Sequence, residues 1–328
     1  MTDQTLSTEQ IDLFGTPFAK IPLSEITKHK SPFVVSYDDL NVPVYYRAGT
    51  GTDLIIYFHG AITRVGPPLP RFQGILHGHK EAHHLSISDP TLLMSAGLTS
   101  TWYQGSSQSD VPAILARMIA AVKKRLGIKR SIYIGASSGG FAALDQGFRD
   151  SGSVVIAANP QTNLKRHHEV VVKNYYNEFW SAELSFQDFL QMNRLNLPET
   201  YRTKTHSKVI YIQNTSDRFH YFNHYVPFVS TFPQTRNFIA DVGFWGVLDH
   251  ANSAPFNETV KLWLDAALMS ESCDANDILM NKRQMDLERL SATAPATEGR
   301  SAGVKPLPTA DIAMTKRIRD WQLSEKKV

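Results

Sequence analysis

The chain has 328 residues, of which 42% are hydrophobic and 20% are charged, and its formal net charge is +3. These values are close to those of ordinary globular proteins, so they exclude a wholly disordered chain and give no indication of a nucleic-acid partner. One cysteine, Cys273, allows neither an intrachain disulfide nor a zinc site built from cysteines. No apolar run approaches the roughly 18–20 residues of a membrane span, and the N-terminal segment lacks the basic start and apolar stretch of a signal peptide. We therefore expect a cytoplasmic protein without a membrane span.

Beyond a polar N-terminal extension at residues 1–30, short apolar runs alternate with longer segments of helical period. The predicted strands are, in chain order, Phe33–Tyr37, Val42–Tyr46, Leu54–Phe58, His84–Ser88, Ser131–Ile134, Val154–Ala158, Val209–Gln213 and Asn237–Val242. Four of them are continuous apolar runs, which are typical of strands buried on both faces of a parallel sheet. The first two alternate more clearly, so we expect them to form an antiparallel edge.

Helical patterns lie between these strands at Asp110–Leu126, Gly139–Arg149 and Pro255–Met269. The first has one apolar face, a capping residue at Ser109 or Asp110, and Gly127 directly after its end. The repeated order of strand and helix predicts an α/β fold with a doubly wound, mostly parallel sheet of about eight strands.

Two regions depart from this rhythm. Residues 163–205 lie between two predicted strands, are rich in aromatic residues and are too long for a simple crossover, so we expect an inserted helical cap. Residues 271–328 contain a stretch rich in Ala, Thr, Pro and Gly, which predicts a flexible tail that can include a short helix around Asp311–Glu325. The main domain is then predicted to span residues 31–270.

Gly135, Ser137 and Gly139 form a G-x-S-x-G pattern between a predicted buried strand and a predicted helix. In that context the serine occupies a strained turn that lifts its Oγ above the sheet, and side chains two positions away would collide with neighbouring backbone. The N–H of Ser138 is then aimed, near a helix N-terminus, at the place where an oxyanion would form. Ser138 itself is the alternative nucleophile, although its flanking residues suit the turn less well. Neither a Walker loop nor a G-x-G-x-x-G loop is present.

With these residues the sequence resembles the α/β-hydrolase superfamily over roughly Pro32–Ser270. The resemblance implies a catalytic triad in the chain order nucleophile, acid, histidine. It places the acid at Asp217, just after a late strand, and the base at His250, in the loop after the last strand. Asp241 and Asp249 are the competing acids.

The run Leu54–Ala61 is similar to the third strand of that superfamily and the His-Gly loop that follows it. The resemblance implies that this loop supplies a second backbone N–H to the oxyanion hole, at Ala61 or alternatively at Ile62. We expect His59 to be structural and to bond loop backbone.

The implied chemistry is acyl transfer through an acyl-serine, which needs no metal and no redox cofactor. The pairs His83/His84 and His167/His168 could indicate a metal, but neither has a third ligand at helical spacing, so surface histidines are the better interpretation.

Trp102, Tyr103, Asn159 and Gln161 are predicted to lie on loops at the strand ends and to bind substrate. Aromatic rings and amides together favour a sugar or another polar ligand, although Trp102 and Tyr103 could equally pack a loop. These stretches are also loosely similar to bacterial polysaccharide- and glycoprotein-modifying members of the superfamily, such as accessory Sec acetylation components. We therefore expect a serine hydrolase that acts on a small-molecule or glycan ester, such as a carbohydrate O-acetyl ester, through an acyl-serine intermediate. The alternatives are an O-acyltransferase that modifies a bacterial surface polysaccharide and a non-catalytic accessory protein with the same fold. The oligomeric state is left open.

Overall fold

The computed structural model describes residues 9–64, 69–73, 79–203, 206–232, 235–245, 258–272 and 274–293. The chain divides into two units, Met1–Asp286 and Leu287–Val328. The described part of the second unit is the helical stretch 287–293, and all other elements belong to the first unit.

Ten strands of the described residues form one sheet, in the order β1-β2-β3-β4-β6-β5-β7-β8-β9-β10. From β6 to β10 all neighbours are parallel, whereas β4 runs antiparallel to both β3 and β6. The predicted α/β class with a mostly parallel sheet is confirmed. The strands are β1 (Gln10–Leu13), β2 (Thr16–Pro22), β3 (Phe33–Tyr37), β4 (Leu40–Arg47), β5 (Asp53–Phe58), β6 (His83–Ile87), β7 (Arg130–Ala136), β8 (Val154–Ala158), β9 (Lys208–Asn214) and β10 (Phe238–Gly243).

The N-terminal residues 10–22 are part of the sheet rather than of a polar extension. They form a hairpin whose two-residue turn, Phe14 and Gly15, has φ values of 55° and 78°. β2 then pairs in parallel with β3, and Phe18 and Ile21 are buried. The antiparallel pair β3–β4 therefore lies inside the sheet and not at its edge. These strands are hard to predict because each carries only one or two apolar residues on its inner face.

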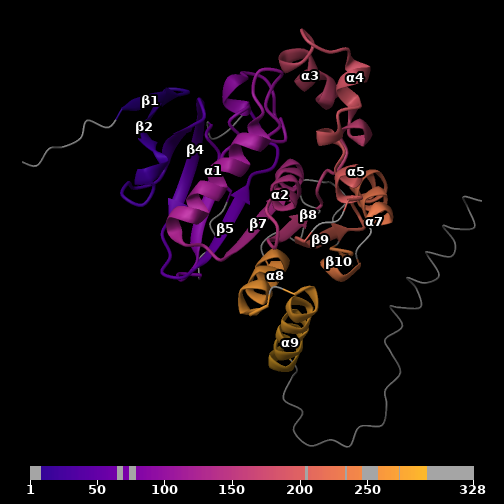
Figure 1. Ribbon diagram of the computed structural model, residues 1–328. Coiled ribbons are helices and arrows are strands. Elements are labelled where there is room, and N and C mark those ends of the chain that lie inside the picture. The colour runs from indigo at the N-terminus through magenta and orange to yellow at the C-terminus, as the bar shows by residue number, and fades with distance from the viewer. Residues whose placement is uncertain are drawn as a thin grey trace, which may run out of the picture. The chain divides into compact units, whose positions relative to one another are not determined.

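The helices α1 (Val111–Leu126), α2 (Ser138–Arg149) and α8 (Glu258–Met269) form where the patterns predict helices. The Asp110 side chain accepts a hydrogen bond from the N–H of Ala113, and Gly127 ends α1 with φ 65°. Helices α1 and α2 lie over one face of the strands (Figure 1) and share a core with Leu54, Ile56 and Phe58 of β5. The alternate β5 residues, Ile55 and Tyr57, pack on the other face with α8.

The region 163–205 is helical in its described residues, and its role as a cap stays a prediction. It contains α3 (Glu169–Phe179), α4 (Phe186–Leu190) and α5 (Leu197–Tyr201), together with two short 3₁₀ turns. Its aromatic residues pack on one another rather than lying on the surface, and Tyr175, Trp180 and Phe189 are each at most 5% exposed. After β9 the chain forms α6 (Arg218–His220), a π-helical turn at Tyr221–Tyr225 and α7 (Val226–Thr231).

The first part of the predicted flexible tail is a helix, α9 (Ala275–Thr293). Ala275 is buried, and Ile278 is part of the core that also contains α8. The Asn281 side chain donates to the Ala266 carbonyl, and Lys282 lies over the Trp263 ring. Few of the apolar residues of α9 share one face, which is why its pattern gives no helical signal. The predicted helix at Asp311–Glu325 lies outside the described residues. In the part of the chain that the structure describes, no helix combines the length and apolar character that crossing a membrane requires.

We predict that Ile278→Ala lowers the free energy of unfolding by about 2–5 kcal/mol, because it leaves a cavity beneath α9. The matched control is Met280→Ala on the same helix, since Met280 is 60% exposed and its loss changes the free energy of unfolding by at most about 0.5 kcal/mol. Urea unfolding of both variants measures the difference. Equal midpoints for the two variants would contradict the docking of α9.

Candidate active site

Ser137 lies in the turn between the end of β7 and the start of α2, at the carboxyl end of a central parallel strand. Its backbone has φ 54° and ψ −121°, a conformation that residues other than glycine adopt only where the surrounding structure imposes it. The N–H of Ser137 donates to the Ala158 carbonyl, and the Ser137 carbonyl accepts from the N–H groups of Phe141 and Gln161. The turn is therefore held from both sides.

The two glycines of the motif are required by close contacts between backbones. A Cβ at Gly135 would lie 2.1 Å from the Gly139 carbonyl oxygen, and one at Gly139 would lie 2.4 Å from the Phe58 carbonyl oxygen at the end of β5. Ser137 is half-buried at the bend, whereas Ser138 is 3% exposed inside the first turn of α2. This geometry favours Ser137 over Ser138 as the reactive side chain.

The His-Gly loop after β5 lies against this turn. A Cβ at Gly60 would be 3.2 Å from the Ala136 carbonyl oxygen and 3.8 Å from Ser137 Cβ. The N–H of Ile62 already donates to the Thr99 carbonyl at 2.9 Å, which disfavours Ile62 as an oxyanion donor. Ser138 and Ala61 stay the predicted donors.

His59 is buried and bonds backbone on both sides of its ring. Its Nδ1–H donates to the Gly60 carbonyl at 2.7 Å, and its Nε2 accepts from the N–H of Asp89 at 3.0 Å. Burial lowers the pKa of His59 to about 4, so the ring is neutral near pH 7. A neutral ring with both nitrogens engaged holds the loop in place and moves no proton.

Asp89 organises the turn that carries Trp102 and Tyr103, whose φ values are 51° and 60°. Its Oδ2 accepts from the Thr101 hydroxyl at 2.6 Å and from the N–H of Tyr103 at 2.8 Å. The Tyr103 hydroxyl in turn accepts from the N–H of His59 and donates to the Ile87 carbonyl. The loops after β5 and β6 are thus joined through buried polar groups.

Trp102 holds the side chain of Gln161, which contacts Ser137. The indole N–H of Trp102 donates to Gln161 Oε1, and this bond aims the amide nitrogen away from the indole. Gln161 Nε2 then donates to Ser137 Oγ at 3.1 Å and lies 3.5 Å from His220 Nε2. Gln161 therefore lies between the candidate nucleophile and a buried histidine that the sequence patterns did not single out.

Asn159 joins the ends of two strands. Its N–H donates to the Ile212 carbonyl, and its Oδ1 accepts from the N–H of Asn214, both at 2.8 Å. All four residues predicted to bind substrate, Trp102, Tyr103, Asn159 and Gln161, are at most 4% exposed and bond the protein itself. Their direct contact with a substrate stays a prediction, and the geometry shows them as supports of the site.

Asp217 follows β9 and caps α6, and its role as the acid stays a prediction. Its Oδ1 accepts from the backbone N–H of His220 at 3.2 Å and from Nδ1 of the same residue at 3.0 Å. Asp241, a competing acid, instead accepts from the indole N–H of Trp263 on α8. The predicted base His250 and the other competing acid, Asp249, lie outside the described residues.

His167, His220 and His224 form a cluster whose ligand-type nitrogens lie within 4.8 Å of one another. The spacing of four between His220 and His224 was the sequence signal for it. His220 donates to a carboxylate, as metal-bound histidines often do. His224 accepts the N–H of Thr162 on Nδ1 at 3.1 Å, so in its neutral form the proton is on Nε2 and neither nitrogen offers a lone pair to an ion. This donor set does not fit a three-histidine metal site.

Three of the four paired histidines are not on the surface, contrary to the prediction from the sequence. His83 and His84 are at most 8% exposed and bond the hydroxyls of Tyr46 and Tyr57 within the sheet. His167 is half-buried in the cluster with His220, and only His168 is exposed. The pairs were misinterpreted because their partners come from distant strands and helices.

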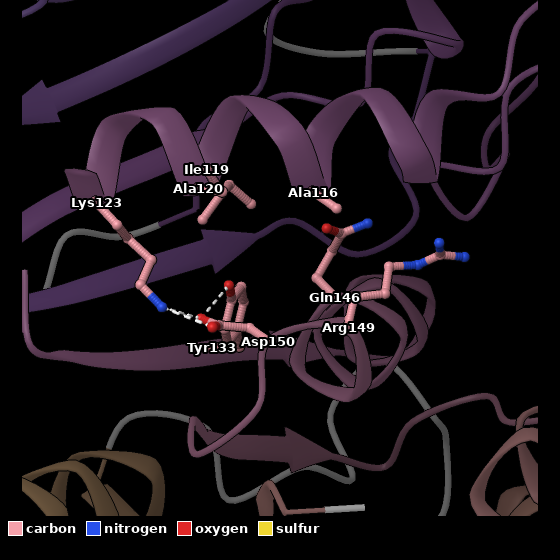
Figure 2. Close-up of a pocket in the computed structure, with 8 residues that line it drawn as sticks. All are labelled: Ala116, Ile119, Ala120, Lys123, Tyr133, Gln146, Arg149 and Asp150. Carbon is pink, nitrogen blue, oxygen red and sulfur yellow. Dashed lines mark hydrogen bonds and ion pairs between the residues drawn. The ribbon is translucent and has the colours of Figure 1, made fainter. Parts of the chain in front are cut away.

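A small cavity of about 50 Å³ lies between α1 and α2, and Figure 2 shows the residues that line it. Its charged groups are already paired, since Lys123 Nζ lies 2.6 Å from the Asp150 carboxylate, which also accepts from the Tyr133 hydroxyl. The cavity is lined by Ala116, Ile119, Ala120, Lys123, Tyr133, Gln146, Arg149 and Asp150, none of which belongs to the candidate site. We do not assign it a function.

The chain is similar in structure to proteins of the α/β-hydrolase fold. A capsule O-acetyltransferase of Neisseria meningitidis serogroup A, in complex with CoA, has 13% identity and a TM-score of 0.47 over 76% of this chain and 94% of its own. A Pyrococcus furiosus esterase has 13% identity and a TM-score of 0.40 over 67% and 83%. A 2,6-dihydroxy-pseudo-oxynicotine hydrolase has 12% identity and a TM-score of 0.43 over 65% and 60%. No family model and no curated protein matches the chain, and likenesses this distant assign no activity.

We predict that Gly139→Ala lowers the free energy of unfolding by about 3 kcal/mol, because the added methyl group would collide with backbone that cannot move freely. Gly97→Ala is the control, because a Cβ there meets nothing within 4 Å. Thermal melting compares the two variants, and a Gly139→Ala protein as stable as Gly97→Ala would refute the close contact.

Proposed function

We propose that this protein is a serine-dependent carboxylester hydrolase that forms an acyl-enzyme on Ser137. The observation that carries the proposal is the position of Ser137, half-buried in a left-handed turn at the end of a central parallel strand and next to the Gly60 loop. A half-buried hydroxyl beside a helix N-terminus can attack an acyl carbonyl that reaches it and have the resulting negative charge stabilised by nearby N–H groups.

In the proposed reaction His250 takes the Ser137 proton while Oγ forms a bond to the acyl carbon. The tetrahedral oxyanion is held by the N–H groups of Ser138 and Ala61. It collapses as the alcohol leaves with the proton from His250, and water then repeats the sequence to release the acid. Asp217 orients the histidine and stabilises its charged form.

We propose an O-acetylated carbohydrate as the substrate class, and this proposal rests on the sequence resemblance to polysaccharide-modifying members of the superfamily. Acyl transfer to a sugar hydroxyl would use the same acyl-serine with that hydroxyl in place of water, so one experiment separates the two activities. Release of acetate without an acceptor supports the hydrolase, whereas release that depends on an added glycan acceptor supports the O-acyltransferase.

Ser137→Ala should abolish turnover of p-nitrophenyl acetate, because loss of the nucleophile costs on the order of 10⁶-fold. Ser138→Ala is the matched control, since Ser138 is proposed to act through its backbone N–H, which alanine retains. Turnover and labelling by a fluorophosphonate are measured for both variants. Normal labelling of Ser137→Ala, or equal losses in both variants, would exclude Ser137 as the nucleophile.

His250→Gln should lower turnover by at least about 10⁴-fold without changing the melting temperature, because the base is lost and the amide cannot accept and return a proton. Asp241→Asn serves as the control. Asp241 accepts a hydrogen bond from Trp263 of α8, and α8 packs on the face of the sheet that α1 and α2 do not cover. Should Asp241→Asn lose more activity than His250→Gln, the assigned base and acid are both misplaced.

A further inference from the structure

The loop after β5 contains three consecutive backbone N–H groups, those of Gly60, Ala61 and Ile62. The first donates to Gln73 Oε1 at 3.2 Å, and the third donates to the Thr99 carbonyl at 2.9 Å. No described residue accepts a hydrogen bond from the N–H of Ala61, which lies between them. This fits the proposed role of Ala61 as a donor to an oxyanion, and that role requires the loop on both sides of Ala61 to be held in place.

The side chain of Arg64 holds the loop on its C-terminal side. Nε of Arg64 donates to the Leu98 carbonyl at 2.8 Å, and Nη2 donates to the carbonyls of Ser95 at 2.9 Å and Leu92 at 3.4 Å. These three carbonyls lie in one short segment between β6 and α1, which begins with the 3₁₀ turn Leu92–Met94. Because a guanidinium group has its donors in a fixed plane, three acceptors determine both its position and its orientation.

The segment that accepts from Arg64 is itself held by α3. The Ser95 hydroxyl donates to Glu178 Oε2 at 3.0 Å and accepts from the N–H groups of Gly97 and Leu98. Burial lowers the pKa of the Arg64 guanidinium, and the negative charge of Glu178 opposes that effect. The loop after β5 is thus joined to α3 through Arg64 and Ser95.

We propose that Arg64 is a positioning residue for the oxyanion hole: by fixing the loop after β5 on residues 92–98, it holds the N–H of Ala61 where the oxyanion forms. The inference rests on the proposed function, because it needs an oxyanion at Ser137. The same loop lies against the Ser137 turn, since a Cβ at Gly60 would be 3.8 Å from Ser137 Cβ. An oxyanion donor acts only within about 2.7–3.1 Å of the oxygen, so a displacement of about 1 Å removes most of its effect.

Arg64→Met keeps the length of the side chain and removes its donors. We expect kcat for p-nitrophenyl acetate to fall on the order of 10–100-fold while KM stays within about 3-fold, because an oxyanion donor acts mainly in the transition state. The inhibitor is a trifluoromethyl ketone, whose carbonyl carbon bonds to the serine Oγ so that its carbonyl oxygen becomes an oxyanion. Its affinity should fall by the same factor as kcat/KM, whereas a loss of stability alone would not change it.

Arg47→Met is the matched control. Arg47 is also half-buried and also bonds backbone, since its Nη2 donates to the His79 carbonyl at 3.2 Å. It pairs with His84 near the start of β6, whereas Ser137 follows the carboxyl end of the parallel strand β7. Its loss should lower the melting temperature and leave kcat and the ketone affinity unchanged. Each protein is assayed as the full chain, and circular dichroism melting reports its folding.

Should Arg64→Met fail to fold, Arg64→Lys decides the question. Lysine keeps the charge, but its single nitrogen cannot donate to the three carbonyls with the geometry of the guanidinium. We expect kcat and the affinity for the ketone to fall together, by about 3–10-fold, at unchanged KM.

The inference is overturned if the folded Arg64 variant keeps its kcat, or if kcat falls while the affinity for the trifluoromethyl ketone does not. A rise in KM that accounts for the whole loss of kcat/KM overturns it as well. In each of these cases, fluorophosphonate labelling of Ser137 in the unmodified protein leaves the proposed function intact. No turnover and no labelling in the unmodified protein overturn both.

Discussion

The first turn of α2 crosses the ends of β5 and β7 at a distance that leaves no room for a side chain. Gly135 and Gly139 have no Cβ, so backbone carbonyl oxygens can lie in the space that a Cβ would fill. These are the oxygen of Gly139 beside Gly135 and the oxygen of Phe58 beside Gly139. This contact forces the chain through the left-handed conformation of Ser137 and brings the helix N-terminus to the end of the sheet. The position of the candidate nucleophile is thus a consequence of how closely one helix packs on two strands.

Around that turn, loops from separate strands are held by buried polar side chains rather than by apolar packing alone. Asp89 holds the turn of Trp102, Trp102 holds Gln161, and Asn159 joins the ends of β8 and β9. Burying such groups is favourable only when each is hydrogen-bonded, so the network permits few alternative loop arrangements. Loops held rigidly in this way keep the groups between them at fixed distances, and such fixed positioning is a large part of what a protein contributes to catalysis.

The strands and helices with strong periodicity were predictable, and β3 and β8 have the predicted bounds to the residue. The short strands β1 and β2 were missed because each has only one or two buried apolar residues, and α9 was missed because few of its apolar residues share one face. The G-x-S-x-G motif identified Ser137 because the motif encodes a local steric requirement. No local pattern could show that Asp217 and Gln161 both lie beside His220, since that proximity arises only when the ends of β8 and β9 are adjacent.

The guanidinium of Arg130, at the start of β7, joins Asp53 on β5 to the carbonyl groups that end α8. It binds both Asp53 oxygens and donates to the carbonyls of Ala267, Leu268 and Ser270. At about 5–20 residues per second, the ribosome needs roughly 7–27 s to add the 137 residues that separate Arg130 from the nearest of these carbonyls. During that time the central strands of the nascent chain exist without the helix that covers their second face. Until α8 has emerged, the apolar side chains on that face of the strands lack their cover, and exposed apolar surface of this kind favours aggregation of a nascent chain.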